Sequence, residues 1–409
     1  MLEGRLIFFH QSIGIGGAQL LLARLAKYMH ENSVNVCYMC PDNGFLKKYL
    51  SDVNCIEHIN SNELNSQKFS DSDIIVSPLS YIKQVQKLKI INENVKLFFW
   101  DMHPYNYIEN LTLSYFHKKN SKLSMLFKMI ESSLIKKYAQ NLSFLQHKNA
   151  VSFMCRKNYT YNMDFFGVDI PANYLPICLE IPNYNSAKVK AHKTDGISIG
   201  WLSRLDHDKV ILLNNFIQAL EKSTITSAAQ FRLFIIGSGD SINLVTKTTD
   251  VAVTFTGALS GIELDHFISE NLDCGFSVGT SALEFAKLSI PTFLVPGNDA
   301  YIDYNNTNNK YLPLDKLSGY DVAVENYHRD ITVDLDTCFT LVLENYSSLA
   351  IQSYEYVSMN HSIIHTAGLL KRYAENSSFN ISHLNKLYTE SAVEIFFNRI
   401  KQFAKKLFA

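Results

Sequence analysis

The sequence predicts an α/β protein built from two doubly wound domains in tandem. Short apolar runs typical of buried strands alternate with helical or loop stretches along most of the 409 residues, and this rhythm predicts parallel sheets covered by helices. A polar, turn-rich segment at residues 181–196 interrupts the rhythm, which then starts again. The hydrophobic content of 47% is enough for two sizeable cores.

The chain begins with an apolar run, three glycines and a helix. Residues 5–10 (RLIFFH) indicate a buried strand, and Gly14, Gly16 and Gly17 follow it. The next apolar residues recur at helical spacing: Ala18, Leu21, Leu22, Leu25, Ala26 and Met29. Because unpaired N–H groups and the positive end of the helix dipole converge at a helix start, this turn is a candidate phosphate site. A tight turn without a ligand is the alternative.

The other predicted strands fall into two groups. They are residues 34–40, 55–60, 73–78, 96–101 and 142–147 in the first half, and 197–202, 231–237, 251–257, 274–279 and 291–296 in the second. Doubly wound sheets bind ligands at the carboxyl ends of their parallel strands. We therefore expect the site in the cleft between the two domains.

Composition and charge exclude several classes of function. The formal net charge is −1, so no overall field attracts nucleic acid or an anionic membrane, and any such binding must be local. The seven cysteines are scattered; Cys37 and Cys40 come closest to a zinc-ligand pair, but no second pair and no His cluster follows, as expected for reduced thiols in a cytoplasm. We predict no signal peptide and no membrane-spanning segment.

Residues that could carry chemistry follow the predicted strands of the second half. Arg204 and Lys209 come after the first of these strands, within IGWLSRLDHDKV, and Gly237 and Gly239 come after the second. The segment CGFSVGTSALEFAKLSIPTFLVP (residues 274–296) then joins a strand, a loop and a helix.

These motifs resemble those of the GT-B glycosyltransferases of the large family-four group (glycosyl transferases group 1), which move a sugar from a nucleotide diphosphate to an acceptor. The resemblance covers most of the chain; it is weak at residues 105–190 and after residue 330. It implies two Rossmann-like domains that face each other across a cleft.

The resemblance also implies a division of the chain. Residues 1–182 are expected to form the acceptor-side domain, 183–195 a linker, and 196–380 the domain that binds the nucleotide-sugar donor. Residues 381–409 are expected to form a C-terminal helix that packs back on the first domain.

Several residues receive roles from the resemblance. Arg204 and Lys209 would stabilise the leaving diphosphate, which suits two cations at a strand end. Glu284 would bind the ribose hydroxyls, which suits a carboxylate with two acceptor oxygens. N–H groups and hydroxyls at Gly279, Thr280 and Ser281 would bind the diphosphate.

Two pairs of glycines complete the implied donor site. Gly16 and Gly17 match the family's GGAE loop, which faces the donor phosphates, and Gln19 stands at its acidic position. Gly237 and Gly239 would let the backbone approach the nucleotide base, or would only close a turn.

One position departs from the family's pattern. Many relatives carry an additional glutamate, which contacts the donor sugar, before the one that Glu284 matches. In this chain Phe276 lies eight positions before Glu284, within a strand, so how the sugar is held stays open. The plain alternative for Glu284 is a carboxylate in the first turn of a helix, favoured by the helix dipole.

Asp101 and His103 lie at the end of a strand of the first domain, in FFWDMHPYNY. In similar proteins a histidine near this position lies beside the transferred sugar, so both residues are candidates for the catalytic site. A histidine with a structural role is the alternative.

Two DxD pairs are the only arrangement that suggests a metal. Asp71 and Asp73 merely precede a strand, and Asp334 and Asp336 lie in a region without a match to the family. We therefore predict no metal and no cofactor beyond the donor itself.

Two stretches are basic and amphipathic. Residues 113–140 combine six lysines with one glutamate among large apolar residues, which suits a helix at an anionic membrane surface. Residues 395–409 (IFFNRIKQFAKKLFA) have a similar character. The alternatives are an ordinary surface helix for the first and packing on the first domain for the second.

The predicted function is that of a retaining, metal-independent hexosyltransferase with a nucleotide-sugar donor, a UDP-sugar being favoured. The acceptor is expected to be a glycan, lipid-linked, in the synthesis of a bacterial O-antigen, lipopolysaccharide or capsule polysaccharide. The enzyme is expected in the cytoplasm or peripherally at the inner face of the plasma membrane.

Three other functions are weighed against this one. A nucleotide-sugar epimerase and a non-catalytic scaffold could share the architecture. Gly14 and Gly16 also begin a GxGxxG pattern of dinucleotide-binding dehydrogenases. Gln19 replaces its third glycine, although Asp42 does follow the second strand.

Overall fold

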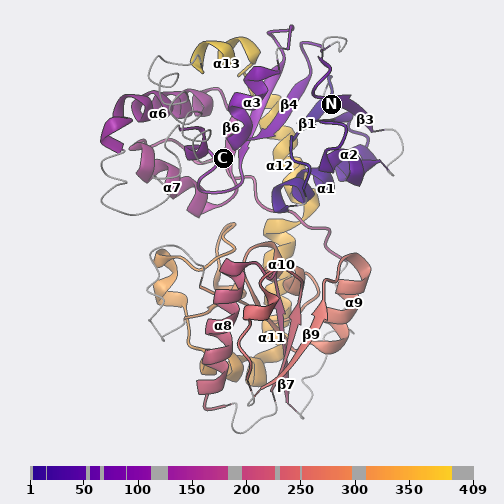
Figure 1. Ribbon diagram of the computed structural model, residues 1–409, viewed down its shortest axis with the longest axis vertical. Helices are drawn as coiled ribbons and strands as arrows, with labels where there is room; N and C mark the ends of the chain where they lie inside the picture. Colours follow the sequence, from indigo (N-terminus) through magenta and orange to yellow (C-terminus); the bar gives the residue numbers. More distant parts are fainter. Residues whose placement is uncertain are drawn as a thin grey trace. The chain divides into compact units, whose positions relative to one another are not determined.

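The computed structural model describes residues 3–14, 16–51, 56–64, 69–88, 90–111, 128–182, 196–225, 231–248, 251–296 and 310–388. The chain forms two compact units. The first unit combines Met1–Cys178 with Ile363–Ala409, and the second is Leu179–Ser362. Each unit contains one six-stranded sheet with helices packed around it (Figure 1).

The sheet of the first unit has the strand order β3-β2-β1-β4-β5-β6, and every pair of neighbouring strands is parallel. Its strands are β1 (Leu6–Phe9), β2 (Val36–Cys40), β3 (Glu57–Asn60), β4 (Ile74–Pro78), β5 (Lys96–Asp101) and β6 (Val151–Phe153). Its helices are α1 (Gly17–Glu31), α2 (Phe45–Leu50), α3 (Ile82–Lys87), α6 (Ser132–His147), α7 (Arg156–Phe166), α12 (Ile363–Asn376) and α13 (Ile381–Leu387). The winding reverses between β1 and β4, which is where doubly wound sheets bind ligands.

The second unit repeats this order as β12-β11-β10-β7-β8-β9. Its strands are β7 (Ile197–Leu202), β8 (Phe231–Ile236), β9 (Ala252–Gly257), β10 (Cys274–Ser277), β11 (Thr292–Leu294) and the antiparallel β12 (Leu312–Pro313). Its helices are α8 (His207–Lys222), α9 (Gly261–Asn271), α10 (Thr280–Ala286) and α11 (Leu335–His361). The winding reverses between β7 and β10. Two doubly wound units with parallel sheets, as the sequence predicts, are thereby confirmed.

Helix α1 has the buried face that the spacing of its apolar residues predicts. The residues Leu21, Leu22, Leu25, Ala26 and Met29 are all buried. One side of the helix therefore packs into the core, as the spacing predicts.

The predicted strand at residues 142–147 is wrong, because these residues form the last turns of helix α6. Leu134, Tyr138, Leu142 and Leu145 are buried at intervals of three or four positions, so the apolar run belongs to one face of a longer helix. A short apolar run does not by itself distinguish a buried strand from a buried helix. The sixth strand is β6, four residues further on.

Residues 363–380, which the sequence assigns to the second domain, belong to the first unit. In Figure 1 the yellow helices α12 and α13 lie among the purple elements of that unit. The backbone there is tied to the start of β5, since the Ser377 hydroxyl donates to the Leu97 carbonyl at 2.7 Å and the Leu97 N–H donates to Phe379 at 2.8 Å. Of the expected C-terminal helix at 381–409, residues 389–409 lie outside the described part.

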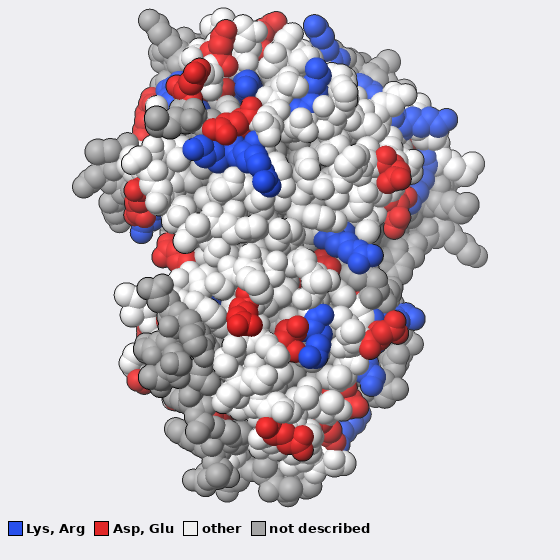
Figure 2. Space-filling view, turned by 180° about the vertical axis from the view of Figure 1, so that it is seen from behind, with Lys and Arg blue, Asp and Glu red and all other residues white. Residues whose placement is uncertain are grey.

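The surface has no dominant charge on the face drawn in Figure 2. Among the coloured residues there, Lys and Arg are interspersed with Asp and Glu, and neither sign forms a continuous patch. The six cysteines within the described ranges are all buried and free. None of the helices that the structure describes is long and apolar enough to cross a bilayer.

Candidate functional site

The loops that follow β7 and β10 leave the second unit's sheet from adjacent strand ends. The Ser277 hydroxyl donates to the Leu202 carbonyl at 2.6 Å, which ties the carboxyl end of β10 to that of β7. This is the point where the winding reverses. Six of the predicted site residues lie in these two loops and in the helices that they open, so the fold brings them to one edge of the sheet: Arg204, Lys209, Gly279, Thr280, Ser281 and Glu284.

Arg204 lies in the loop before α8, and Lys209 lies in the first turn of that helix. Each side chain forms one weak ion pair. The Arg204 side chain is 73% exposed and its Nη1 lies 3.3 Å from Asp206 Oδ2. The Lys209 Nζ lies 3.3 Å from the exposed Asp208 carboxylate. Exposed pairs of this kind contribute at most about 1 kcal/mol. Both cations can therefore exchange their present partners for a phosphate.

Gly237 and Gly239 allow two loops to pack together. A Cβ at Gly237, where φ is +144°, would lie 1.9 Å from the Ser203 carbonyl oxygen, and one at Gly239 would lie 2.5 Å from the Leu205 carbonyl carbon. The Leu205 N–H donates to the Ser238 carbonyl at 2.9 Å in the same contact. These glycines thus fix the backbone on both sides of Arg204, which supports the packing alternative for them.

The loop before α10 is built around a left-handed glycine. Gly279 has φ +62°, its N–H donates to the Val322 carbonyl at 2.7 Å, and a Cβ there would meet no atom within 4 Å. Thr280 and Ser281 follow as the first helical residues and are half-buried. This loop therefore combines a turn that requires glycine with open space and two hydroxyls.

Glu284 lies in the second turn of α10, so the expectation of a first-turn carboxylate is wrong. The helix begins at Thr280 rather than earlier, because Gly279 in its left-handed conformation still belongs to the turn. The Glu284 side chain is 9% exposed and its Oε2 lies 2.7 Å from Lys287 Nζ. The helix dipole is therefore not its main electrostatic partner. Phe276 is fully buried and stacks on Phe293 in the core, so it offers nothing to a sugar.

In the first unit, the glycines after β1 do not adopt the left-handed conformation. Gly16 is extended with φ −160° and precedes α1, and Gly17 is the first residue of that helix. A Cβ at Gly14 or Gly17 would meet nothing within 4 Å, whereas one at Gly16 would only displace the end of the Gln19 side chain. The backbone conformation does not require these glycines. We infer that they leave space for a ligand.

Replacing Gly17 with Val tests that inference. A Cβ at Gly17 would meet no atom within 4 Å, so the melting temperature should stay within a few degrees of the wild type's. If that open space receives substrate, activity should fall at least about tenfold, because the added side chain would fill it. Gly17→Ala, with a smaller side chain, should lose less. A folded Gly17→Val protein with full activity would remove this loop from the site.

His10 is a buried histidine that the sequence analysis did not single out. It directly follows β1, is 3% exposed, and accepts a hydrogen bond from the Ser12 N–H through Nδ1 at 3.0 Å. Its ring meets the Tyr81 ring edge-on at 4.7 Å, and Tyr81 lies just beyond the end of β4. His10 thus joins the glycine turn after β1 to the neighbouring strand end. Its place directly before the turn was the one available signal.

Stability should therefore depend on pH through His10. Burial lowers the pKa of His10 to about 4, below the value of about 6.5 expected in the unfolded chain. The unfolded state binds the proton first, so this stability is present above pH 6.5 and is lost as pH falls toward 4. Between pH 7 and 5 we expect a loss of about 2 kcal/mol. Urea unfolding should show that His10→Asn, whose side-chain oxygen can still accept from Ser12, loses less over this range; an equal loss in both proteins contradicts the assignment.

Asp101 and His103 do not form a common site. Asp101 is fully buried at the end of β5, where its Oδ2 accepts from the Asn162 amide at 2.9 Å. Burial raises the pKa of Asp101 well above its usual value. His103 is exposed, and its Nδ1 accepts from the Tyr105 N–H at 3.3 Å. Asp101 thus anchors α7 to the strand, whereas the His103 ring lies at the surface.

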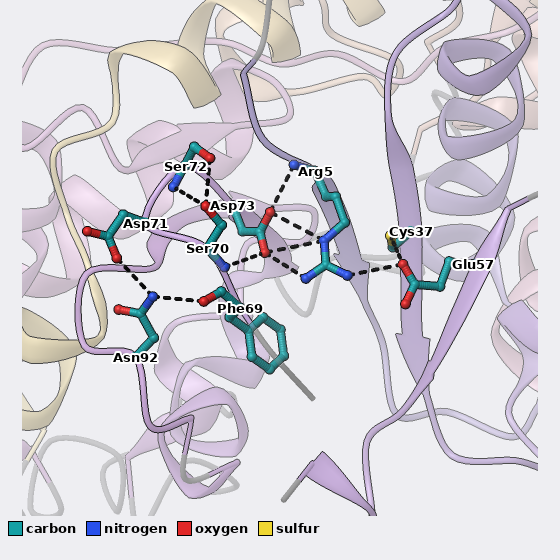
Figure 3. Close-up of polar contacts among 9 residues, drawn as sticks. All are labelled: Arg5, Cys37, Glu57, Phe69, Ser70, Asp71, Ser72, Asp73 and Asn92. Atoms are coloured by element: carbon teal, nitrogen blue, oxygen red, sulfur yellow. Dashed lines mark hydrogen bonds and ion pairs between the residues drawn. The ribbon is translucent and has the colours of Figure 1, made fainter. Parts of the chain in front are cut away.

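The carboxylates of the first DxD pair are engaged in structural contacts (Figure 3). Asp73 Oδ2 lies 2.7 Å from Arg5 Nη2, and the Asp73 carboxylate also accepts from the Arg5 and Ser70 N–H groups. Asp71 accepts from the Asn92 amide at 2.9 Å. Arg5 and Asp73 directly precede β1 and β4, so this cluster lies at the amino ends of these two strands (Figure 3).

The second DxD pair is engaged in the same way. Asp334 caps α11 by accepting from the Thr337 N–H at 2.8 Å. Asp336 accepts from the hydroxyls of Ser223 and Thr224. Within the described ranges, no group of three or more His, Cys, Asp or Glu side chains is arranged to hold a metal ion.

Only part of the basic stretch at 113–140 lies within the described residues. From Ser132 onward its apolar side chains, such as Leu134 and Tyr138, pack into the core as part of α6. Met129 and Ile130 are 69% and 44% exposed, beside the exposed Lys128. Lys118, Lys119 and Lys122 lie in the undescribed range. The exposed apolar surface of this stretch is therefore confined, among described residues, to its middle.

Solved structures of other proteins match both units in one alignment. A glycosyltransferase from Rickettsia africae matches with a TM-score of 0.58 and 14% identity, over 91% of this chain and 98% of that one. HepE from Anabaena, solved with UDP and glucose, matches with a TM-score of 0.53 and 12% identity, over 90% and 99% of the two chains. The chain has the GT-B fold.

The GT-B architecture is also found in the match to the trehalose-6-phosphate synthase OtsA. Its TM-score is 0.51 at 11% identity, over 91% of this chain and 99% of that one. No protein-family model and no curated protein sequence matches the chain. At these identities the likeness shows the GT-B fold and leaves the chemistry to be argued from the residues.

Proposed function

We propose that the chain is a retaining, metal-independent glycosyltransferase whose second unit binds a nucleotide-diphosphate sugar, a UDP-sugar being favoured. One observation carries this proposal. Arg204 and Lys209 follow β7, the Gly279–Ser281 loop follows β10, and these two strands end beside each other in the sheet. Two exchangeable cations and a loop with two hydroxyls suit a diphosphate. Glu284, in the helix that this loop opens, would bind the ribose hydroxyls.

In the proposed reaction the bond between the anomeric carbon and the diphosphate oxygen breaks, and its electron pair leaves with the diphosphate. The acceptor hydroxyl oxygen bonds to the same face of the sugar and gives up its proton to the leaving phosphate oxygen. Arg204 and Lys209 stabilise the charge that develops on the diphosphate, in the role that a metal ion plays elsewhere. For the first unit by itself, the proposed substrate contacts are His103 and the open space at Gly16 and Gly17.

The proposed acceptor is a glycan, lipid-linked, of a bacterial surface polysaccharide. The exposed Met129 and Ile130 beside Lys128 support a contact with an anionic membrane, because apolar side chains flanked by lysine bind such surfaces. We expect Met129→Ser with Ile130→Ser to weaken sedimentation with anionic vesicles and to leave the melting temperature unchanged. Ile262→Ser, at an exposed position of the second unit, is the control. A wild-type protein that stays in the supernatant contradicts the contact.

A thermal-shift panel tests the proposed donor. The panel compares UDP, GDP, ADP and CMP with their sugars, and a ligand at 100 times its Kd should add about 2.7 kcal/mol of stability. A shift with one nucleotide, and release of that nucleotide from its sugar in the presence of EDTA, support the proposal. No shift with any of them contradicts it. Activity that EDTA abolishes and manganese restores refutes the metal-independent mechanism.

The same panel separates the alternatives. A nucleotide-sugar epimerase converts the bound donor without any acceptor. A scaffold protein binds the nucleotide, or nothing, and turns over no donor. Epimerised product, or nucleotide binding without transfer to any glycan acceptor, would therefore replace the proposed function.

A further inference from the structure

Lys287 forms two ion pairs at the end of α10. Its Nζ lies 2.7 Å from Glu284 Oε2 and 2.8 Å from Asp265 Oδ1, and its side chain is only 11% exposed. Asp265 belongs to α9, whereas Glu284 lies one turn before Lys287 on its own helix. Figure 1 shows α9 and α10 as separate elements of the second unit. One ammonium group thus contacts carboxylates of two helices.

The burial of Lys287 is costly unless both carboxylates stay ionised beside it. Burial acts to lower the pKa of Lys287, but the charge of Glu284 and the hydrogen bond to Asp265 outweigh it, and the pKa is raised. The ammonium is therefore charged at neutral pH.

The contact with Glu284 does more than join two helices. The pair with Asp265 already ties α10 to α9, and a contact between positions 284 and 287 of one helix adds nothing to that tie. What the contact does fix is the orientation of the Glu284 carboxylate. A free glutamate side chain samples many rotamers, and ordering it on binding weakens binding by about fivefold to thirtyfold.

We propose that Lys287 is a positioning residue that holds the Glu284 carboxylate in the orientation that accepts both ribose hydroxyls of the donor nucleotide. This inference rests on the proposed function of Glu284 in the second unit. Lys287 itself touches no substrate. Its effect should therefore appear only with ligands that carry both hydroxyls.

The discrimination between UDP and 2′-deoxy-UDP tests the inference. A hydrogen bond to a carboxylate contributes about 1.5 to 3 kcal/mol, so the wild type should bind UDP at least about tenfold more tightly than 2′-deoxy-UDP. Lys287→Met should reduce this ratio at least fivefold by weakening UDP, with the Kd for 2′-deoxy-UDP nearly unchanged. Titration calorimetry measures both Kd values. If the thermal-shift panel selects another base, GDP or ADP and its 2′-deoxy form replace UDP and 2′-deoxy-UDP.

A second lysine provides a matched control. Lys316 Nζ lies 2.7 Å from Asp315, whose side chain is 3% exposed, so Lys316→Met also removes the cation beside a buried carboxylate. It should change the melting temperature without changing the UDP to 2′-deoxy-UDP ratio. If Lys287→Met does not fold, Lys287→Gln, which keeps a hydrogen-bond donor without the charge, is measured in the same way.

The outcomes distinguish this inference from the function on which it rests. If the wild type binds no nucleotide, the proposed function fails. If it binds UDP but does not discriminate against 2′-deoxy-UDP, or if the Lys287 variants weaken both ligands equally, Lys287 has only a structural role and the inference is overturned. A ratio that falls in the Lys287 variants and not in Lys316→Met supports it.

Discussion

Alanine at Arg204 or at Lys209 is expected to lower kcat for sugar transfer at least tenfold and to leave the fold intact. Each cation would make a charge-assisted bond to the leaving diphosphate, and such bonds contribute about 1.5 to 3 kcal/mol, which corresponds to about tenfold to 150-fold in rate. Neither side chain holds the fold together, because each now pairs only with a neighbouring acid in the sequence. Steady-state rates with the identified donor, and melting temperatures, measure the two effects separately.

The control for this pair lies at the other end of α8, the helix that Arg204 precedes and that contains Lys209. Lys222 is exposed at the far end of α8, so Lys222→Ala removes a cation without touching the candidate site and should keep the wild-type rate. Wild-type rates in both Arg204→Ala and Lys209→Ala contradict the proposed role. A loss of melting temperature that matches the loss of rate would assign the two cations to the fold instead.

The sequence allowed most of the fold to be predicted because most of the strands are buried on both faces. A parallel strand such as β1 or β7 is a continuous apolar run, and runs of this kind recur at intervals that suit crossover helices. The restart of the rhythm after residue 196 marked the second unit. The wrong prediction of a strand at residues 142–147 also comes from relying on short apolar runs, since six residues of an amphipathic helix can resemble a buried strand.

The candidate residues that could be predicted are those next to strand ends in the sequence. Arg204 follows β7 and Gly279 follows β10, and these two strands are neighbours in the sheet. The strand order alone therefore predicts that the two residues lie near each other. The conformation at Gly279 is also local, because a glycine between a strand and a helix is typical of a left-handed turn. The fold places such residues together without any further information.

Other features depend on contacts between distant segments and were missed for that reason. The partner of Lys287 on α9 is 22 positions away, and no spacing rule connects the two. The burial of Asp101 depends on Asn162 of α7, which is 61 positions away. His10 is unremarkable in the sequence until Ser12 and Tyr81 surround it. Three-dimensional packing, and not local pattern, decides whether such groups are charged.

Replacing Asp73 with Ala is expected to cost about 3 kcal/mol of unfolding free energy. The Asp73 carboxylate is almost fully buried and accepts from the Arg5 guanidinium, the Arg5 N–H and the Ser70 N–H (Figure 3). Its removal leaves a partly buried cation and two backbone donors without their acceptor, and breaking a buried pair in this way costs about 3 to 5 kcal/mol. Because Arg5 keeps its contact with Glu57 at 3.0 Å, we expect the lower end of that range, measured by urea unfolding.

Asp71, the other member of this DxD pair, is the matched control. It is exposed and accepts only from asparagine amides, so Asp71→Ala should cost less than about 1 kcal/mol. The pKa of Asp73 is lowered, because the hydrogen bonds from Arg5 and Ser70 outweigh the opposing effect of burial. The stabilisation is therefore present above the unfolded pKa of about 3.9 and is lost as pH falls through the lower folded value. The difference in unfolding free energy between wild type and Asp73→Ala should shrink in acid. If Asp71→Ala and Asp73→Ala instead lose equal unfolding free energy at pH 7, and both lose activity, the two carboxylates share a metal site.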